Sequence, residues 1–166
     1  VLSPKGFNAS QIRDIYRSLS SSQSGKRFFS TEWEVLRDRE YLWIQKKDSI
    51  QLIPELIIEE IERTPSFVIP RDKHIACLDA DKLNHPLTIR KWERGDKFIP
   101  LGMNGKKKVS DYLTDKKYSQ SQKENQYVVC SGEEIVWLVN ERTDHRYRIT
   151  DSTQRILLIK IKKDGQ

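Results

Sequence analysis

Two short motifs carry residue types from which a metal or catalytic site could be built. Asp79 and Asp81 could offer carboxylate oxygens to Mg²⁺, but they would need further oxygen ligands. Asp144 stands next to His145 as in an acid–base pair, yet no partnered Ser or Cys nucleophile accompanies it. A turn with a side-chain cap and a polar loop explain the two motifs better. We therefore expect no catalytic and no metal-binding residue in this chain.

Positive charge is concentrated in residues 87–118. The 166-residue chain has 30 Lys and Arg against 24 Asp and Glu, a net charge of +6. Residues 87–118 hold nine basic and four acidic side chains, so five of the six net charges lie in 32 residues. Such clustering raises the local potential and favours a polyanion such as nucleic acid. A solvated basic face without a partner is the alternative that charge alone leaves open.

A strand, a turn and a tight loop are expected to present these cations together. Leu87–Arg90 has the pattern of a strand, and Gly95-Asp96 that of a turn. Gly102 and Gly105 permit a tight loop that places Lys106–Lys108 directly before a helix, whose N-terminal amides could add to phosphate binding. Basic side chains on phosphates supply affinity and register with little sequence information.

The N-terminal region predicts a helix followed by a β-hairpin. Asn8, with Gln11 three positions later, is the capping-box arrangement that begins a helix. Phe28–Leu36 and Tyr41–Gln45 form the two expected strands on either side of a charged turn. Ile50–Arg63 fits a strand or a short helix, and its isoleucines favour the strand.

Strand patterns dominate the rest of the chain, after the expected boundary at Thr64–Ser66. Val109–Lys116 has helical spacing, whereas Ser119–Gln126 is a polar stretch. The fold class is thus α+β: a small helix-plus-hairpin region at residues 1–66, then a mostly β domain at residues 67–166 with one or two short helices. The expected strands of that domain are His74–Asp79, Leu87–Arg90, Tyr127–Ser131, Glu134–Val139, Tyr147–Thr150 and Arg155–Ile161.

Cysteine usage and hydropathy suggest a reducing, aqueous compartment. Cys77 and Cys130 lie in apolar runs without a neighbour at metal-ligand spacing, so we expect both to be buried and reduced. No apolar run approaches the roughly 20 residues of a membrane span, and no signal peptide is visible. We expect a cytoplasmic location and no membrane partner. Because the chain begins with Val, we also expect it to be part of a longer protein.

The same basic run carries an ordered pattern of Gly, Pro and Lys. After Arg90 come G-D-x-F-x-P-L-G at residues 95–102, a short loop, and K-K-x-S-D-Y-L at residues 107–113. This run resembles the C-terminal domain of the tRNA(Ile)-lysidine synthetase family, and the resemblance extends from roughly Asp79 to Lys160. Two positions depart from the family pattern: Asn140 replaces a usual Gly, and Lys123 is the only cation where an Arg is frequent.

The resemblance implies the C-terminal part of an ATP-dependent ligase that adds lysine to the wobble cytidine of an isoleucine tRNA. The chemistry, with ATP and Mg²⁺ as cofactors, would belong to an N-terminal ATP-pyrophosphatase domain of the same protein, whose S-G-G-x-D-S loop this sequence lacks. The chain itself would need no cofactor and would bind the tRNA body and acceptor stem. Residues 1–66 would be the linker or substrate-binding region. A homodimer is compatible with this picture.

The resemblance assigns contacts with the tRNA backbone to the basic residues. A-form RNA is recognised mainly through phosphates and 2′-hydroxyls, which suits such a set. Trp92, Phe98 and Trp137 could stack on unpaired bases, although core packing explains each of them better. The expected contacts are Arg90, Lys91, Arg94, Lys97, Lys106, Lys107, Lys108, Lys116 and Lys117, with Arg142 and Arg146 as secondary candidates.

Other classes of function fit part of the same pattern. A stand-alone nucleic-acid-binding module would have no ligase domain upstream. A protein-interaction domain would use the basic surface to meet an acidic protein. A metal-dependent hydrolase built on Asp79 and Asp81 is a more distant third.

Overall fold

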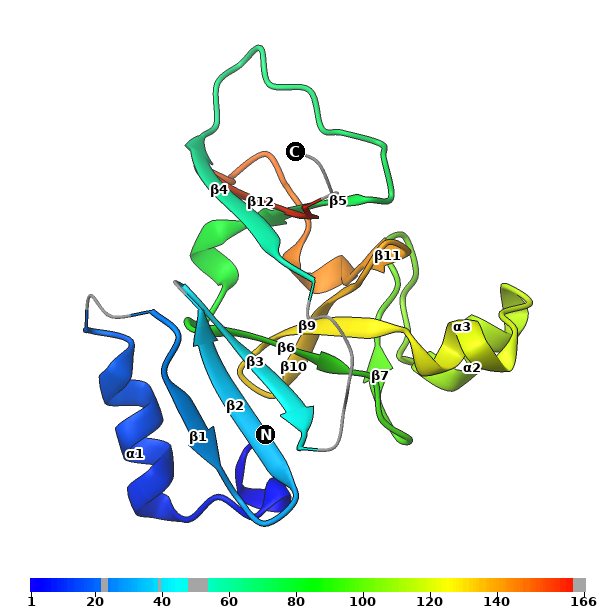
Figure 1. The fold of residues 1–166 in the computed structure, drawn as a ribbon. Helices are drawn as coiled ribbons and strands as arrows, with labels where there is room; N and C mark the ends of the chain where they lie inside the picture. Colours follow the sequence, from blue (N-terminus) through cyan, green and yellow to red (C-terminus); the bar gives the residue numbers. More distant parts are fainter. Residues whose placement is uncertain (22–23, 39, 48–53, 163–166) are drawn as a thin grey trace.

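The computed structural model describes residues 1–21, 24–38, 40–47 and 54–162. Its strands are β1 Arg27–Phe29, β2 Trp33–Asp38, β3 Tyr41–Lys46, β4 Leu56–Glu62, β5 Ile75–Asp79, β6 Leu87–Lys91, β7 Lys97–Phe98, β8 Lys107–Lys108, β9 Tyr127–Ser131, β10 Glu134–Leu138, β11 Arg142–Thr143 and β12 Arg155–Ile161. They form a seven-stranded sheet (β1-β2-β3-β6-β9-β10-β11), a three-stranded sheet (β4-β12-β5) and a β7-β8 ribbon (Figure 1). Short helices accompany them, which confirms the predicted α+β class.

Helix α1, Ala9–Ser18, begins where the sequence predicts it. The Asn8 side chain accepts the Gln11 N–H at 2.8 Å, and the Gln11 side chain accepts the Asn8 N–H at 2.9 Å. These two bonds satisfy backbone donors that the first turn leaves free. The helix buries Ile15 against Val35 and Leu42 of the β2–β3 hairpin. Capping thus sets where the helix begins, and its apolar face fixes it on the sheet.

The predicted strand Phe28–Leu36 is wrong as one element, because the chain turns at Ser30 and forms β1 and β2 instead. The Ser30 hydroxyl donates to the Lys5 carbonyl at 2.7 Å and accepts the Trp33 N–H at 3.1 Å. These bonds tie the turn to the N-terminal segment. Ser30, Thr31 and Glu32 are three consecutive polar residues, and this break in the apolar pattern coincides with the turn.

One helix has bounds that were not predicted, and one further expectation is corrected. The polar stretch Ser119–Gln126 contains a helix, α3 Gln120–Glu124, started by a capping box between Ser119 and Gln122. It has no apolar periodicity, so only its cap signals it. Tyr147–Thr150 is not a strand: a 3-10 helix, His145–Tyr147, is followed by a turn closed by hydrogen bonds between Thr150 and Thr153.

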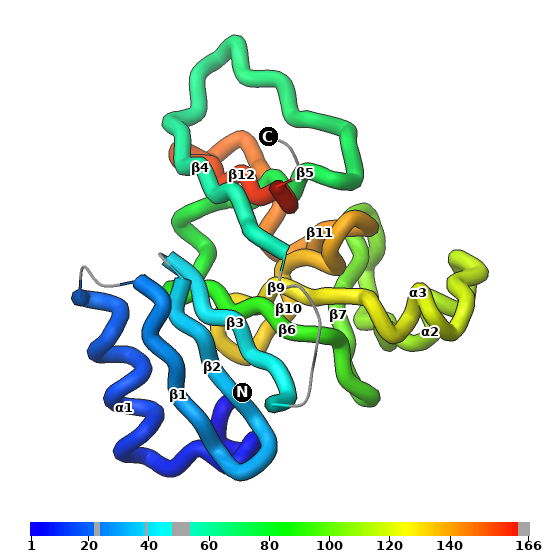
Figure 2. Tube along the Cα trace, in the orientation of Figure 1, coloured from blue at the N-terminus to red at the C-terminus, as the bar shows by residue number. Residues whose placement is uncertain are grey.

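The remaining predicted elements are confirmed, including the helix α2, Val109–Asp115, and the β9–β10 hairpin. β4 confirms the strand interpretation of Ile50–Arg63 where that segment is described, whereas residues 50–53 lie outside the described residues. Helix α1 lies on one side of the molecule and α2 with α3 on the other (Figure 2).

Both larger sheets contain strands from the two halves of the chain. β3 runs parallel to β6, with Tyr41 opposite Leu87 and Trp43 opposite Ile89, and β4 pairs with β12. The boundary expected at residue 66 falls in the connection between β4 and β5. The division into a linker region and a tRNA-binding domain therefore stays a prediction about function.

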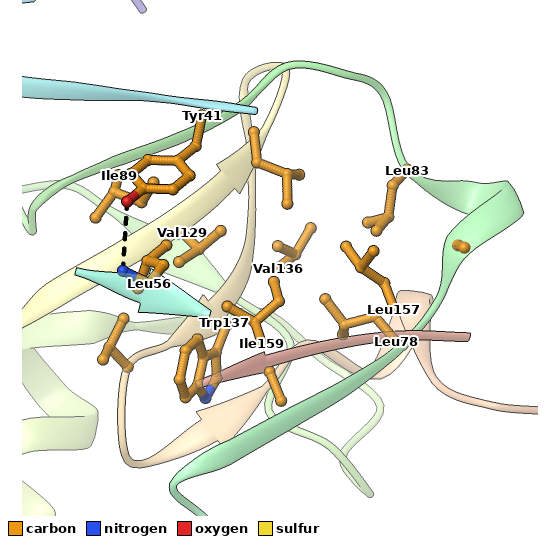
Figure 3. Packing of buried hydrophobic residues seen from close by; sticks show 14 of the residues in the cluster. Tyr41, Leu56, Leu78, Leu83, Ile89, Val129, Val136, Trp137, Leu157 and Ile159 are labelled. Carbon is orange, nitrogen blue, oxygen red and sulfur yellow. Dashed lines mark hydrogen bonds between the residues drawn. The ribbon is translucent and has the colours of Figure 1, made fainter. Parts of the chain in front are cut away.

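The largest apolar cluster lies between the two larger sheets (Figure 3). Trp137 and Ile89 come from the seven-stranded sheet, and Leu157 and Ile159 from β12. The Tyr41 hydroxyl donates to the Asp38 carboxylate at 2.8 Å and accepts the Leu56 N–H at 3.4 Å. Burial and the Asp38 carboxylate raise the pKa of Tyr41 to about 12, so the hydroxyl stays protonated and links the two sheets.

Both cysteines are buried and free, as the sequence predicts. Burial raises the pKa of the Cys77 and Cys130 thiols to about 11 each. Only the thiolate reacts with disulfide reagents. We therefore expect a disulfide reagent in mildly alkaline buffer to modify neither thiol in the folded chain and both thiols in the unfolded chain. Fast modification of either thiol in the folded protein would contradict this packing.

Candidate nucleic-acid interface

The lysine-rich segment forms the β7-β8 ribbon and the loop between its strands. Lys97 lies directly opposite Lys108, and both side chains are exposed. Phe98, opposite Lys107, is fully buried in an apolar cluster with residues of α2. Like charges directly opposite each other destabilise a strand pair. The buried Phe98 anchors the ribbon. An anion bound between Lys97 and Lys108 would relieve the repulsion between their charges.

The start of this ribbon is fixed by an internal ion pair. The Arg90 guanidinium donates to both Asp96 oxygens, at 2.8 and 3.0 Å, and Asp96 also accepts the Glu93 N–H at 2.7 Å. Burial lowers the pKa of Arg90, but the hydrogen bonds and charge of Asp96 outweigh burial, so the pKa rises. Arg90, an expected RNA contact, is only 7% exposed and holds the turn before β7.

The far side of the loop is held by Asp144, which is fully buried. Its carboxylate accepts the Ile99 N–H at 2.9 Å and the Arg146 backbone and guanidinium N–H groups, also at 2.9 Å. His145 Nδ1 accepts the Gly102 N–H at 3.0 Å. Asp144 and His145 thus hold the loop in place through hydrogen bonds to its backbone. Arg146 forms ion pairs with Asp144, at 2.9 Å, and with Glu134, at 3.1 Å.

The other expected contacts differ in whether their side chains have ion-pair partners. Lys107 bonds Asp115, and its ammonium lies 5.9 Å from the Tyr112 ring, with Lys116 5.7 Å from the same ring. Arg142 is exposed. Its positive charge lowers the pKa of Tyr112, although burial raises that pKa overall. Among the described residues, no ion-pair partner exists for Lys91, Arg94, Lys97, Lys106, Lys108, Lys116, Lys117 or Arg142.

The expected contribution of the helix amides to phosphate binding is not supported at the first helical position. The Val109 N–H, at the start of α2, donates to the Asp96 carbonyl at 2.9 Å. This amide therefore joins the end of the ribbon to its beginning. The exposed lysine ammonium groups without an ion-pair partner remain available to an anion.

Asp79 and Asp81 occupy a capped turn, as the sequence predicts. Asp79 accepts the Asp81 N–H at 3.1 Å and the Thr153 hydroxyl at 2.8 Å, and Asp81 pairs with Arg155. Within the described part of the chain, no group of three His, Cys, Asp or Glu side chains is placed to hold a metal ion. No helix among these residues is long and apolar enough to cross a membrane.

Sequence reasoning missed a cavity of about 610 Å³ beside the start of the basic segment. It lies where β3 meets the end of β6, two strands whose residues are more than forty positions apart. No local pattern links these residues, and only the tryptophans of the hairpin hint at an aromatic surface. The described lining residues are Trp33, Trp43, Ile44, Gln45, Lys46, Lys91, Trp92, Glu93, Arg94 and Tyr127.

The three aromatic residues considered for base stacking have different positions. Phe98 and Trp137 are fully buried in the core and cannot reach a ligand. Trp92 is half-buried and lines the cavity, with its indole N–H donating to the Lys123 carbonyl at 2.6 Å. Of the three, only Trp92 is placed to meet a base.

Comparison with known proteins identifies relatives of this chain. A family model described as the TilS substrate binding domain matches residues 1–47. The chain is similar to the tRNA(Ile)-lysidine synthase of Bacteroides thetaiotaomicron, with 55% identity over 163 residues that cover 96% of this chain and 38% of that protein. The enzyme of the same name from Parabacteroides distasonis is 43% identical over 173 residues, covering 96% of this chain and 39% of that protein.

The chain thus spans about two fifths of the length of these relatives. Among solved structures, the crystal structure of the TilS C-terminal domain superposes with a TM-score of 0.57 at 19% identity. The match covers 67% of this chain and 85% of that one, and it supports the fold.

The Asp96→Asn variant tests the internal ion pair. It removes the nearer carboxylate from the buried Arg90 guanidinium and leaves only Glu93, at 4.0 Å, so we expect the free energy of unfolding to fall by about 3–5 kcal/mol. Asp115→Asn, which removes the partner of Lys107 on the exposed side of α2, is the matched control, with an expected loss below about 1 kcal/mol. Urea denaturation measures both. Equal losses would show that Arg90–Asp96 does not organise the loop.

Proposed function

The chain is related to the C-terminal region of the tRNA(Ile)-lysidine synthases, and on that premise we propose that it binds an isoleucine tRNA. The full-length protein would add lysine to the wobble cytidine of that tRNA. Chemistry would take place in an N-terminal ATP-pyrophosphatase domain, with ATP and Mg²⁺, and this chain would supply binding alone. A cytoplasmic location and a homodimer of the full-length protein belong to the same proposal.

The observation that carries this proposal is the set of exposed lysines on the β7-β8 ribbon and its loop. Lys97, Lys106 and Lys108 lie together on a rigidly held segment, and none has an ion-pair partner among the described residues. Unneutralised cations at fixed spacing suit the regular phosphates of an RNA helix. Lys116 and Lys117, at the end of α2, extend the set. Arg90 and Arg146 have structural roles in this proposal.

Separation of binding from chemistry has a physical reason. A tRNA is a large substrate whose reacting base lies far from most of its surface. Contacts remote from the reacting atom can position that base before reaction, and this removes part of the entropic barrier. A domain that grips phosphates without reacting groups of its own is therefore useful to such an enzyme.

The triple variant Lys97→Ala, Lys106→Ala, Lys108→Ala tests the proposed interface. Each lost phosphate contact lowers the magnitude of the slope of log affinity against log salt by about 0.7–0.9, so we expect weaker tRNA binding and a slope smaller in magnitude by about 2–3. Filter binding or fluorescence anisotropy over a salt series measures both quantities. Lys26→Ala, Lys82→Ala, Lys160→Ala is a control with the same change of charge at other exposed positions.

Two outcomes would contradict the proposal. Equal losses in both triple variants would mean that total charge, and not the ribbon, governs binding. Failure of the unaltered chain to bind tRNA, together with capture of an acidic protein that tRNA does not displace, would favour a protein-interaction domain instead.

A further inference from the structure

The cavity beside the ribbon has walls that are aromatic and held in place. Trp43 and Tyr127 meet edge to face, with ring centres 5.5 Å apart and an interplanar angle of 89°. Trp33 has the Lys5 ammonium 4.4 Å from its ring centre, and Lys5 in turn pairs with Glu93. Trp92 is fixed by its hydrogen bond to the Lys123 carbonyl. The cavity is therefore preformed, and a ligand would not have to order its walls on binding.

Three cations accompany these rings. Lys46 lies at the end of β3, and Lys91 and Arg94 lie at and just beyond the end of β6. None of the three forms an ion pair with a described residue. Glu93, the one carboxylate among the described lining residues, pairs with Lys5 and lies 4.0 Å from the Arg90 guanidinium. The lining thus combines apolar rings with unneutralised positive charge.

This combination of rings and cations restricts the chemical class of the ligand. Flat aromatic walls favour a planar π system, and the cations require a negative charge attached to it. A volume of about 610 Å³ lies within the usual range for a small-ligand site of about 300–1,000 Å³. A nucleotide unit, with its base inside and its phosphate at the cations, has this chemistry. An apolar protein side chain would fill the cavity but would leave the cations unused.

The position of the cavity connects it to the proposed interface. Arg94, on its lining, precedes Lys97 of the ribbon by three residues, and the Arg90–Asp96 pair holds the turn between them. A backbone that follows the ribbon would therefore reach the cavity directly. The opposite wall, with Trp33 and Trp43, comes from the segment that matches the TilS substrate binding domain.

We propose that this cavity receives one unpaired nucleobase of the bound RNA, against the partly exposed rings of Trp33 and Trp92, while Lys46, Lys91 and Arg94 meet the adjoining phosphates. The inference rests on the proposed function, because it adds a base-binding position to a surface that otherwise contacts only the backbone.

The test compares two RNA probes on the 166-residue chain. One is a short single strand that carries 2-aminopurine, and the other is a blunt-ended duplex without unpaired bases. We expect the single strand to bind with quenched 2-aminopurine fluorescence, as stacking on an aromatic ring produces. Trp92→Leu and Trp33→Leu should each weaken single-strand binding at least about fivefold and restore fluorescence, since one stacked base contributes about 1–3 kcal/mol. Duplex binding should stay unchanged in both variants.

Two further variants separate stacking from structure. Trp92→Phe keeps a flat ring and should retain most of the binding and quenching, whereas a loss equal to that of Trp92→Leu would overturn the stacking role. Tyr16→Leu removes an exposed aromatic side chain from α1 and should change nothing. Thermal unfolding of each variant confirms that it is folded.

The outcomes also distinguish this inference from the proposed function. Duplex binding without quenching of the single strand would overturn the base-binding cavity and leave the phosphate interface intact. Unchanged single-strand affinity in the Leu variants would do the same and would favour an apolar protein side chain as the occupant. If neither RNA binds, the proposed function itself is contradicted.

Discussion

Parallel pairing of β3 with β6 joins the two halves of the chain, and the arrangement of the remaining features depends on it. Each strand would otherwise present an open edge of unpaired backbone groups, which native sheets cover or pair. With Ile44 opposite Arg90, the end of β3 lies beside the end of β6. This register forms the aromatic cavity between segments remote in sequence, and it fixes the strand from which the basic segment continues.

Two carboxylates, one partly and one fully buried, then give that segment its shape. Asp96 holds the turn before the ribbon, and Asp144 holds the loop within it; each accepts backbone N–H groups as well as a guanidinium. A buried carboxylate is stable only when paired and hydrogen-bonded in this way. Arg90 and Arg146 are consequently occupied inside the protein. These two arginines hold the surface together, whereas Lys97, Lys106 and Lys108 have no ion-pair partner among the described residues.

In the proposed RNA complex, the free lysines and the cavity would provide complementary kinds of recognition. Lysines on a rigid ribbon contact phosphates and are insensitive to sequence, whereas an aromatic cavity accepts a base only where the RNA leaves one unpaired. Together they would distinguish a folded RNA with both helical and unpaired parts from a simple duplex.

Features with local causes could be predicted from the sequence. The capping box at Asn8, the β9–β10 hairpin and the concentration of lysines follow from neighbouring residues, as did the family resemblance carried by the ordered Gly, Pro and Lys pattern. The sequence could not separate Arg90 from Lys97, since both are basic residues of one run. Only the tertiary structure buries the first against Asp96 and exposes the second. It alone also brings Trp33 and Trp43 to Trp92, because pairing between distant strands is decided by packing of the whole chain and not by any local pattern.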